Sequence, residues 1–269
     1  MIDVRVLIDD ALPAPWRREH GLALWVTVRP AGGGAPRRLL MDVGQHAEAL
    51  SANAAASGVS LARASAVVLS HGHYDHTGGL RALAEAGYEG PLFLGPDAER
   101  RRFSVQVGAD GALGRMRKQI GMPEPDLLRQ FDVRRVGGLC EVDGWLTLFT
   151  LPQAAPPNAR LLAADGVGAD TFSDEVFALV SDGREEWLLG GCTHHGLPQL
   201  LSHVFGPLGR VSVGAFVGGL HLQGRGRGEV ESVAREAEAY DVGRWVLLHC
   251  TGEEARAAWR GRFNCQMAW

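Results

Sequence analysis

The 269-residue sequence has few cysteines, no long apolar run and no excess of one charge sign. It contains no Cys-x-x-Cys pair among its four cysteines, which argues against a disulfide-stapled secreted domain. No apolar stretch approaches the roughly 20 residues that a membrane-spanning helix requires. The N-terminal segment MIDVRVLIDD lacks the basic and apolar regions of a signal peptide. We therefore expect a cytoplasmic protein that does not associate with membranes.

The charge balance and composition narrow the class of protein further. Lys and Arg number 27 and Asp and Glu number 31, which gives a net charge of −4. This balance argues against a protein that coats nucleic acid, so we expect a small molecule as the partner. Hydrophobic residues make up 46% of the chain, as in an ordinary globular protein. The sequence does not indicate an oligomeric state.

Apolar periodicity predicts alternating strands and helices. Strands are predicted at Val4–Ile8, Leu22–Val28, Arg38–Asp42, Ala66–Ser70, Pro91–Leu94, Val176–Val180, Trp187–Leu189, Val211–Val217 and Arg244–Leu248. Helices are predicted at His46–Ser57, Leu80–Ala86, Leu197–Phe205 and Glu229–Tyr240. Strand–helix units in both halves predict an α/β fold, either a four-layer αββα sandwich or one doubly wound sheet. We find no long linker, so a single domain over residues 1–269 is expected.

The middle of the chain differs in composition. Basic residues gather there: Arg100, Arg101, Arg102, Arg115, Arg117, Lys118, Arg134 and Arg135. One interpretation is a solvated insertion or lid, which would span about residues 97–170. The other is a surface that faces a phosphorylated or carboxylated ligand.

Seven of the ten histidines follow the C-terminal ends of predicted strands. They are His71, His73, His76, His194, His195, His221 and His249. In α/β sheets the loops beyond these strand ends converge on the ligand crevice. The four strand ends that carry imidazoles therefore predict one shared site.

The segment His-Gly-His-Tyr-Asp-His is the most specific of these clusters. His71 and His73 lie two apart on an extended segment, so both can face one ion. Asp75 and His76 follow on the turn into a helix and can reach a second ion. Two such ions would hold a hydroxide near neutral pH. The spacing predicts a dinuclear metal site.

The segment SHGHYDHTGGL resembles the HxHxDH signature of the metallo-β-lactamase-fold superfamily, which consists mostly of dinuclear metallohydrolases. The segments EHGLALWV, LLMDVGQ, GGCTHHG, VGGLHL and LLHCTG are similar, in this order, to one subfamily. Its members are usually labelled 7,8-dihydropterin-6-methyl-4-(β-D-ribofuranosyl)-aminobenzene-5′-phosphate synthase-like. The resemblance covers roughly the first and last thirds of the chain and implies the αββα sandwich.

The resemblance also implies a ligand set. His71, His73 and His194 would hold one divalent ion, and Asp75, His76 and His249 the second. A superfamily member normally supplies a bridging Asp from the segment that here reads GGCTHHG, where this chain has Cys192. Either Cys192 ligates as a thiolate, or Asp174 or Glu175 takes the place of the Asp.

Two further residues complete the predicted site. Asp42 resembles the carboxylate that accepts an imidazole N–H and fixes the tautomer of a metal-bound histidine. His221 faces the same crevice, and either it or Asp75 would handle protons. We assign no function to His20, His46 or His203.

Together these residues predict a hydrolase with two divalent ions. Zinc is the expected metal, and iron or manganese is compatible with the ligands. A metal-bound hydroxide would attack a small anionic substrate such as a phosphoester. Two alternatives stay open: a condensing enzyme of the pterin pathway acting on a phosphoribosyl substrate, and a non-catalytic protein that binds a small ligand through its metal site.

Overall fold

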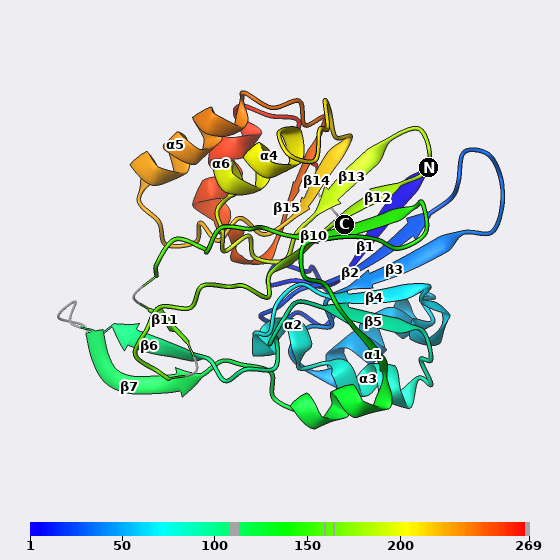
Figure 1. Ribbon diagram of the computed structural model, residues 1–269, viewed down its shortest axis with the longest axis horizontal. Helices are drawn as coiled ribbons and strands as arrows, with labels where there is room; N and C mark the ends of the chain where they lie inside the picture. The colour runs from blue at the N-terminus through cyan, green and yellow to red at the C-terminus, as the bar shows by residue number, and fades with distance from the viewer. Residues whose placement is uncertain (108–112, 159, 164, 267–269) are drawn as a thin grey trace.

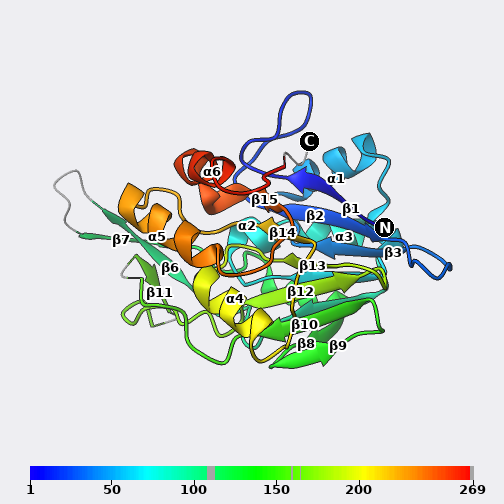
Figure 2. The same cartoon turned by 90° about the horizontal axis from the view of Figure 1, so that it is seen from above.

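A computed structural model describes residues 1–107, 113–158, 160–163 and 165–266 of the chain. For residues 106–107 and 113–116 it describes the backbone alone. Two six-stranded sheets lie face to face, with helices on their outer surfaces (Figures 1 and 2). This arrangement confirms the four-layer αββα sandwich and excludes the single doubly wound sheet.

The first sheet comes mostly from the N-terminal half. In spatial order it contains β1 (Ile2–Ile8), β2 (Ala23–Val28), β3 (Arg37–Met41), β4 (Ala66–Leu69), β5 (Pro91–Leu94) and β8 (Asp132–Arg135). The pairs β1–β2 and β2–β3 are antiparallel, and the pairs from β3 to β8 are parallel. The parallel part therefore brings the C-terminal ends of β3 and β4 to one edge.

The second sheet comes mostly from the C-terminal half. In spatial order it contains β15 (Trp245–Leu247), β14 (Ala215–Gly218), β13 (Glu186–Leu189), β12 (Val176–Ser181), β10 (Leu146–Thr150) and β9 (Leu139–Glu141). The pairs β13–β14 and β14–β15 are parallel, and the others are antiparallel. Three strands of this sheet thus also end at a common edge.

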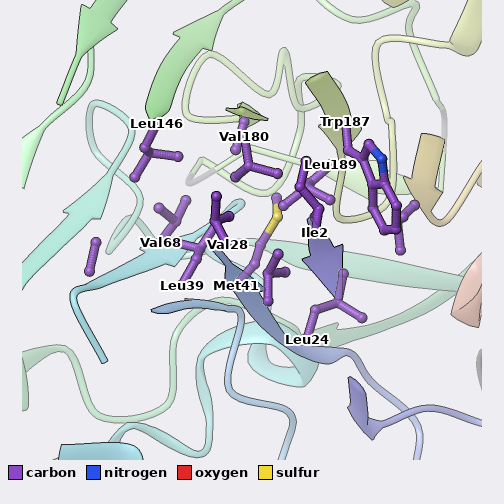
Figure 3. Packing of buried hydrophobic residues seen from close by; sticks show 14 of the residues in the cluster. Ile2, Leu24, Val28, Leu39, Met41, Val68, Leu146, Val180, Trp187 and Leu189 are labelled. Atoms are coloured by element: carbon purple, nitrogen blue, oxygen red, sulfur yellow. The ribbon is translucent and has the colours of Figure 1, made fainter. Parts of the chain in front are cut away.

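Strand alternation divides the apolar residues between the layers. Leu39 and Met41 of β3 face the second sheet, whereas Leu40 faces the outer helices. Trp187 and Leu189 of β13 pack against the first sheet in the same way (Figure 3). This inter-sheet core fixes how the strand ends of the two sheets sit relative to each other.

Helices and turns complete the layers. The first sheet is covered by α1 (Ala47–Ala56) and α3 (Leu80–Glu85), and the second by α4 (Leu197–Phe205), α5 (Arg227–Ala237) and α6 (Glu253–Arg260). One turn of helix, α2 (Tyr74–Thr77), follows β4. Short 3₁₀ turns lie at Leu61–Arg63, Pro125–Gln130 and His249–Thr251.

A small third sheet stands apart from the sandwich. It consists of β6 (Phe103–Val107), β7 (Leu113–Gln119) and β11 (Leu161–Leu162), and projects to one side (Figure 1). Strands β8, β9 and β10 also fall within residues 97–170, but they belong to the main sheets. Only part of the predicted insertion therefore lies outside the sandwich.

The four predicted helices and eight of the nine predicted strands are confirmed, whereas strands β6 to β11 and helix α6 were not predicted. The strand predicted at Val211–Val217 begins only at Ala215, because Val211 is 87% exposed and lies outside the sheet. Helix α6 was missed, because Trp259 is the only large apolar residue among its eight residues. In the described part of the chain, no helix combines the length and apolarity needed to cross a membrane.

Candidate metal centre

The predicted site residues converge where the strands of both sheets end. The HGHYDH segment follows β4, Cys192 and His194 follow β13, His221 follows β14 and His249 follows β15. Most of them line a pocket of about 320 Å³ together with residues of the third sheet. Asp42, His221 and His249 have positive φ angles of 61°, 52° and 45°, although none is glycine. Such backbone strain is characteristic of functional sites.

The first candidate group consists of His71, His73 and His194. The Nε2 atoms of His71 and His194 lie 3.3 Å apart, and the His73 ring centroid lies 4.5 Å and 5.1 Å from their ring centroids. His73 Nε2 is buried without a hydrogen-bond partner among the described residues. Leaving a buried nitrogen unpaired is costly, so the cluster fits a cation that the three imidazoles would share.

The protonation of the first candidate group suits metal binding. Burial and the neighbouring imidazoles lower the pKa of His71 and His194 well below the ordinary value. Burial lowers the pKa of His73 to about 3, although Asp75 opposes this shift. All three rings are therefore neutral near pH 7, which is the form that binds metals.

The second candidate group consists of Asp75, His76 and His249. Asp75 Oδ2 lies 3.3 Å from His249 Nε2 and 3.7 Å from His76 Nε2. Burial alone would lower the pKa of both imidazoles, but Asp42 and Asp75 raise that of His76, and Asp10 and Asp75 raise that of His249. This group is thus built to hold positive charge, in contrast to the first.

Cys192 joins the two groups. Its Sγ lies within 4.8 Å of ligand atoms of His71 and His194, and equally of His76 and His249. The Sγ–His76 Nε2 distance is 3.2 Å. Burial, reinforced by Cys250, raises the pKa of the Cys192 thiol well above its ordinary value. A thiolate at this position therefore requires nearby cations.

Carboxylates fix the orientation of the imidazoles in the second candidate group. Asp42 Oδ2 lies 2.6 Å from His76 Nδ1, and Asp42 also accepts hydrogen bonds from Ser70. Asp10 Oδ1 lies 2.7 Å from His249 Nδ1. In the neutral, metal-binding form of each ring, Nδ1 donates to its carboxylate and Nε2 presents its lone pair to the centre. Asp42 thus occupies the place that the sequence predicted for it.

Comparisons with known proteins agree with this architecture. Residues 31–91, which include β4 and the HGHYDH segment, match the family model described as "Metallo-beta-lactamase superfamily". The structure of Tm1679, described as a metal-dependent hydrolase of the beta-lactamase superfamily, superimposes with a TM-score of 0.80 over 99% of this chain and 96% of that one. The chain has the metallo-β-lactamase fold.

Other relatives of this metallo-β-lactamase-fold protein differ in chemistry. It is 23% identical, over 93% of its length and 87% of the relative, to the 7,8-dihydropterin-6-methyl-4-(beta-D-ribofuranosyl)-aminobenzene-5'-phosphate synthase of Methanocaldococcus jannaschii. Zn²⁺-bound PqqB from Methylobacterium extorquens aligns with 99% of the chain at 17% identity and a TM-score of 0.53, covering 98% of PqqB. Tm1679 is 22% identical. These likenesses show the fold alone.

The metallo-β-lactamase-fold site corrects the prediction for Asp174 and Glu175. Asp174 lies 2.5 Å from Arg102 and accepts a hydrogen bond from the Gly72 N–H, so it holds the HGHYDH loop instead of acting as a ligand. Glu175 accepts the backbone N–H groups of His194 and His195. A Cβ at Gly72 would lie 1.7 Å from the Ala98 carbonyl oxygen, so the loop requires glycine there.

His20 lines the pocket, although no sequence pattern assigned it a function. Its Nε2 lies 3.3 Å from Asp75 Oδ2, and its Nδ1 lies 2.9 Å from Asp10 Oδ2. Asp10 was missed as well. Neither residue follows a strand in the parallel part of a sheet, so the strand-end pattern could not find them; the only signal was the position of His20 in the EHGLALWV segment.

The basic middle segment contributes little positive charge to the pocket. Arg102 is buried in ion pairs with Asp170 and Asp174. Arg134 and Arg135 pair with carboxylates on the surface, and Arg100 donates to Ser173. Lys118 of β7 does line the pocket, 4.7 Å from the Tyr74 ring centre. The side chain of Arg115 lies outside the described residues.

Proposed function

We propose that this protein is a metal-dependent hydrolase that cleaves a small anionic ester, such as a phosphoester. The observation that carries the proposal is the position of Cys192, shared by two ligand groups at the base of one pocket. Imidazole and thiolate ligands suit zinc best, and the carboxylate of Asp75 also accommodates iron or manganese. We propose that each candidate group holds one ion.

Residues around the candidate groups would bind the substrate and transfer protons. Bound divalent ions supply Lewis-acid activation of water and of the substrate's electrophilic centre. Lys118 lies at the pocket wall and is placed to bind an anionic substituent of the substrate. The His221 ring lies 4.4 Å from that of His194 and is half-buried, so its imidazole can exchange a proton with a leaving group in the pocket.

A condensing activity is the second candidate, and the likeness to the methanogen synthase favours it. That relative matches 93% of the chain, and its name specifies a 5′-phosphate. Both candidates need an anionic substrate beside the same metal ligands. In the hydrolase, water would attack the substrate, whereas in the condensing enzyme a second substrate would attack it.

Metal analysis and a substrate panel test the proposal. The purified protein should contain two equivalents of zinc and hydrolyse bis-p-nitrophenyl phosphate, a phosphomonoester or a lactone. A matched His71→Ala variant should lose both metal and turnover. Full metal content with formation of the dihydropterin–aminobenzene product and no hydrolysis would establish the condensing enzyme instead. Full metal content with neither activity would favour a binding protein.

A further inference from the structure

We infer that His20 is a further ligand of the metal ion held by the second candidate group. The inference rests on the proposed two-metal site. It adds an imidazole from the loop before β2 to a ligand set otherwise drawn from the ends of β4, β13 and β15. The second ion would then be held by Asp75, His76, His249, Cys192 and His20.

The distances around Asp75 match the spacing of ligands about one ion. The Nε2 atoms of His20 and His249 both lie 3.3 Å from Asp75 Oδ2. Two neighbouring ligands that each bind one ion at about 2.1 Å are separated by about 3.0–3.4 Å. The two imidazoles also face each other, with ring centroids 4.8 Å apart. His20 thus approaches Asp75 as closely as the predicted ligand His249 does.

Asp10 orients both imidazoles at once. Its Oδ1 lies 2.7 Å from His249 Nδ1 and its Oδ2 lies 2.9 Å from His20 Nδ1. Each ring therefore donates Nδ1–H to the same carboxylate and turns its Nε2 toward Asp75. Two imidazole nitrogens and a carboxylate oxygen, all ligand types that divalent ions bind, thus converge on one point. The carboxylate of Asp10, which both rings share, is the second, independent reason to assign His20 to the ion.

His46 shows how an imidazole without such a role is placed. Its side chain is similarly exposed, at 57% against 49% for His20, and its Nδ1 also contacts a carboxylate, Glu19 Oε2, at 2.8 Å. However, its Nε2 lies 3.1 Å from the Gln45 side-chain amide and not from another candidate ligand. His46 is therefore the matched control for His20.

Titration of the metal-free protein with Co²⁺ tests the inference. His20→Ala should weaken binding of the second Co²⁺ at least about tenfold and alter its visible absorption, because one ligand is lost. Asp10→Asn should also weaken binding of the second Co²⁺, since the imidazoles of His20 and His249 lose the carboxylate that accepts their Nδ1–H groups. His46→Ala should match the wild type in both readouts.

The outcomes separate this inference from the two-metal proposal. If His20→Ala binds the second Co²⁺ with wild-type affinity and spectrum, His20 is not a ligand, whatever happens to turnover. Loss of turnover alone in that variant would place His20 on the substrate instead. If the wild type binds no second ion at all, the two-metal proposal fails together with the inference.

Discussion

Cys192 Sγ lies 3.2 Å from His76 Nε2, while it also reaches the ligand atoms of His71 and His194. One sulfur atom therefore stands where the two candidate groups meet. A carboxylate would span two ions with two oxygens, whereas a thiolate spans them with a single, softer atom. This relationship makes Cys192 the most direct test of the proposed centre.

Replacing Cys192 should disrupt both ions. We expect Cys192→Ser to lower Co²⁺ affinity at least about tenfold and to abolish the near-ultraviolet thiolate-to-cobalt absorption, because a hydroxyl is a weaker ligand than a thiolate. Cys140→Ser, at the edge strand β9, is the control and should retain both. An unchanged absorption in Cys192→Ser would show that the sulfur is not a ligand.

Metal binding should release protons and strengthen as pH rises. The carboxylates that raise the pKa values of His76 and His249 favour the protonated rings in the metal-free protein, so a bound metal ion must displace protons. Calorimetry in buffers of different ionisation enthalpy, from about pH 6 to about pH 8, should therefore report proton release. The pairing of His76 and His249 with carboxylates also stabilises the metal-free fold. This stabilisation is fully present below the pKa that the histidines have in the unfolded chain, and it is lost as the pH rises through their pKa in the folded protein. Buffer-independent heats would contradict the assignment.

His221 should contribute to turnover and not to metal binding. We expect His221→Ala to keep both ions but to lower kcat about a hundredfold, since it removes a positioned proton-transfer group. His203→Ala is the control, because His203 lies on α4 and packs against Phe149. If His221→Ala loses metal instead, His221 belongs to the ligand set.

Lys118 should set the affinity for an anionic substrate. Lys118→Ala should raise KM about tenfold with little change in kcat, as expected for loss of a charge-assisted contact made equally before and during the reaction. Lys118→Arg should retain most of the affinity. Arg117→Ala is the control, since successive strand residues point to opposite faces. A KM that does not change with substrate charge would exclude this role.

Arg102 should contribute to stability through buried charge. Arg102→Met would leave Asp170 and Asp174 without their partner, which should cost about 3–5 kcal/mol in urea unfolding. The exposed Arg134–Asp132 pair offers the contrast, because Arg134→Met should cost less than about 1 kcal/mol. An equal loss of unfolding free energy in the two variants would show that burial does not determine how much these ion pairs stabilise the fold.

Sequence patterns narrowed the fold to an αββα sandwich or one doubly wound sheet, the family resemblance implied the sandwich, and histidine spacing located the core of the site. Apolar alternation specified most of the strands, because side chains on a strand face alternate sides whatever its neighbours are. The spacing of His71, His73, Asp75 and His76 is likewise local, so it identified the candidate centre before any strand was placed.

Only the tertiary structure decided which distant residues complete the centre. Asp10 and His249 are 239 residues apart, and their contact exists only because the two sheets pack face to face. Pairing of β2, β3 and β4 within the first sheet places His20 beside Asp75, and the fold also places Asp174 in an ion pair with Arg102. Sequence spacing reports such relationships only within one element, since contacts between elements depend on how the whole chain buries its apolar surface.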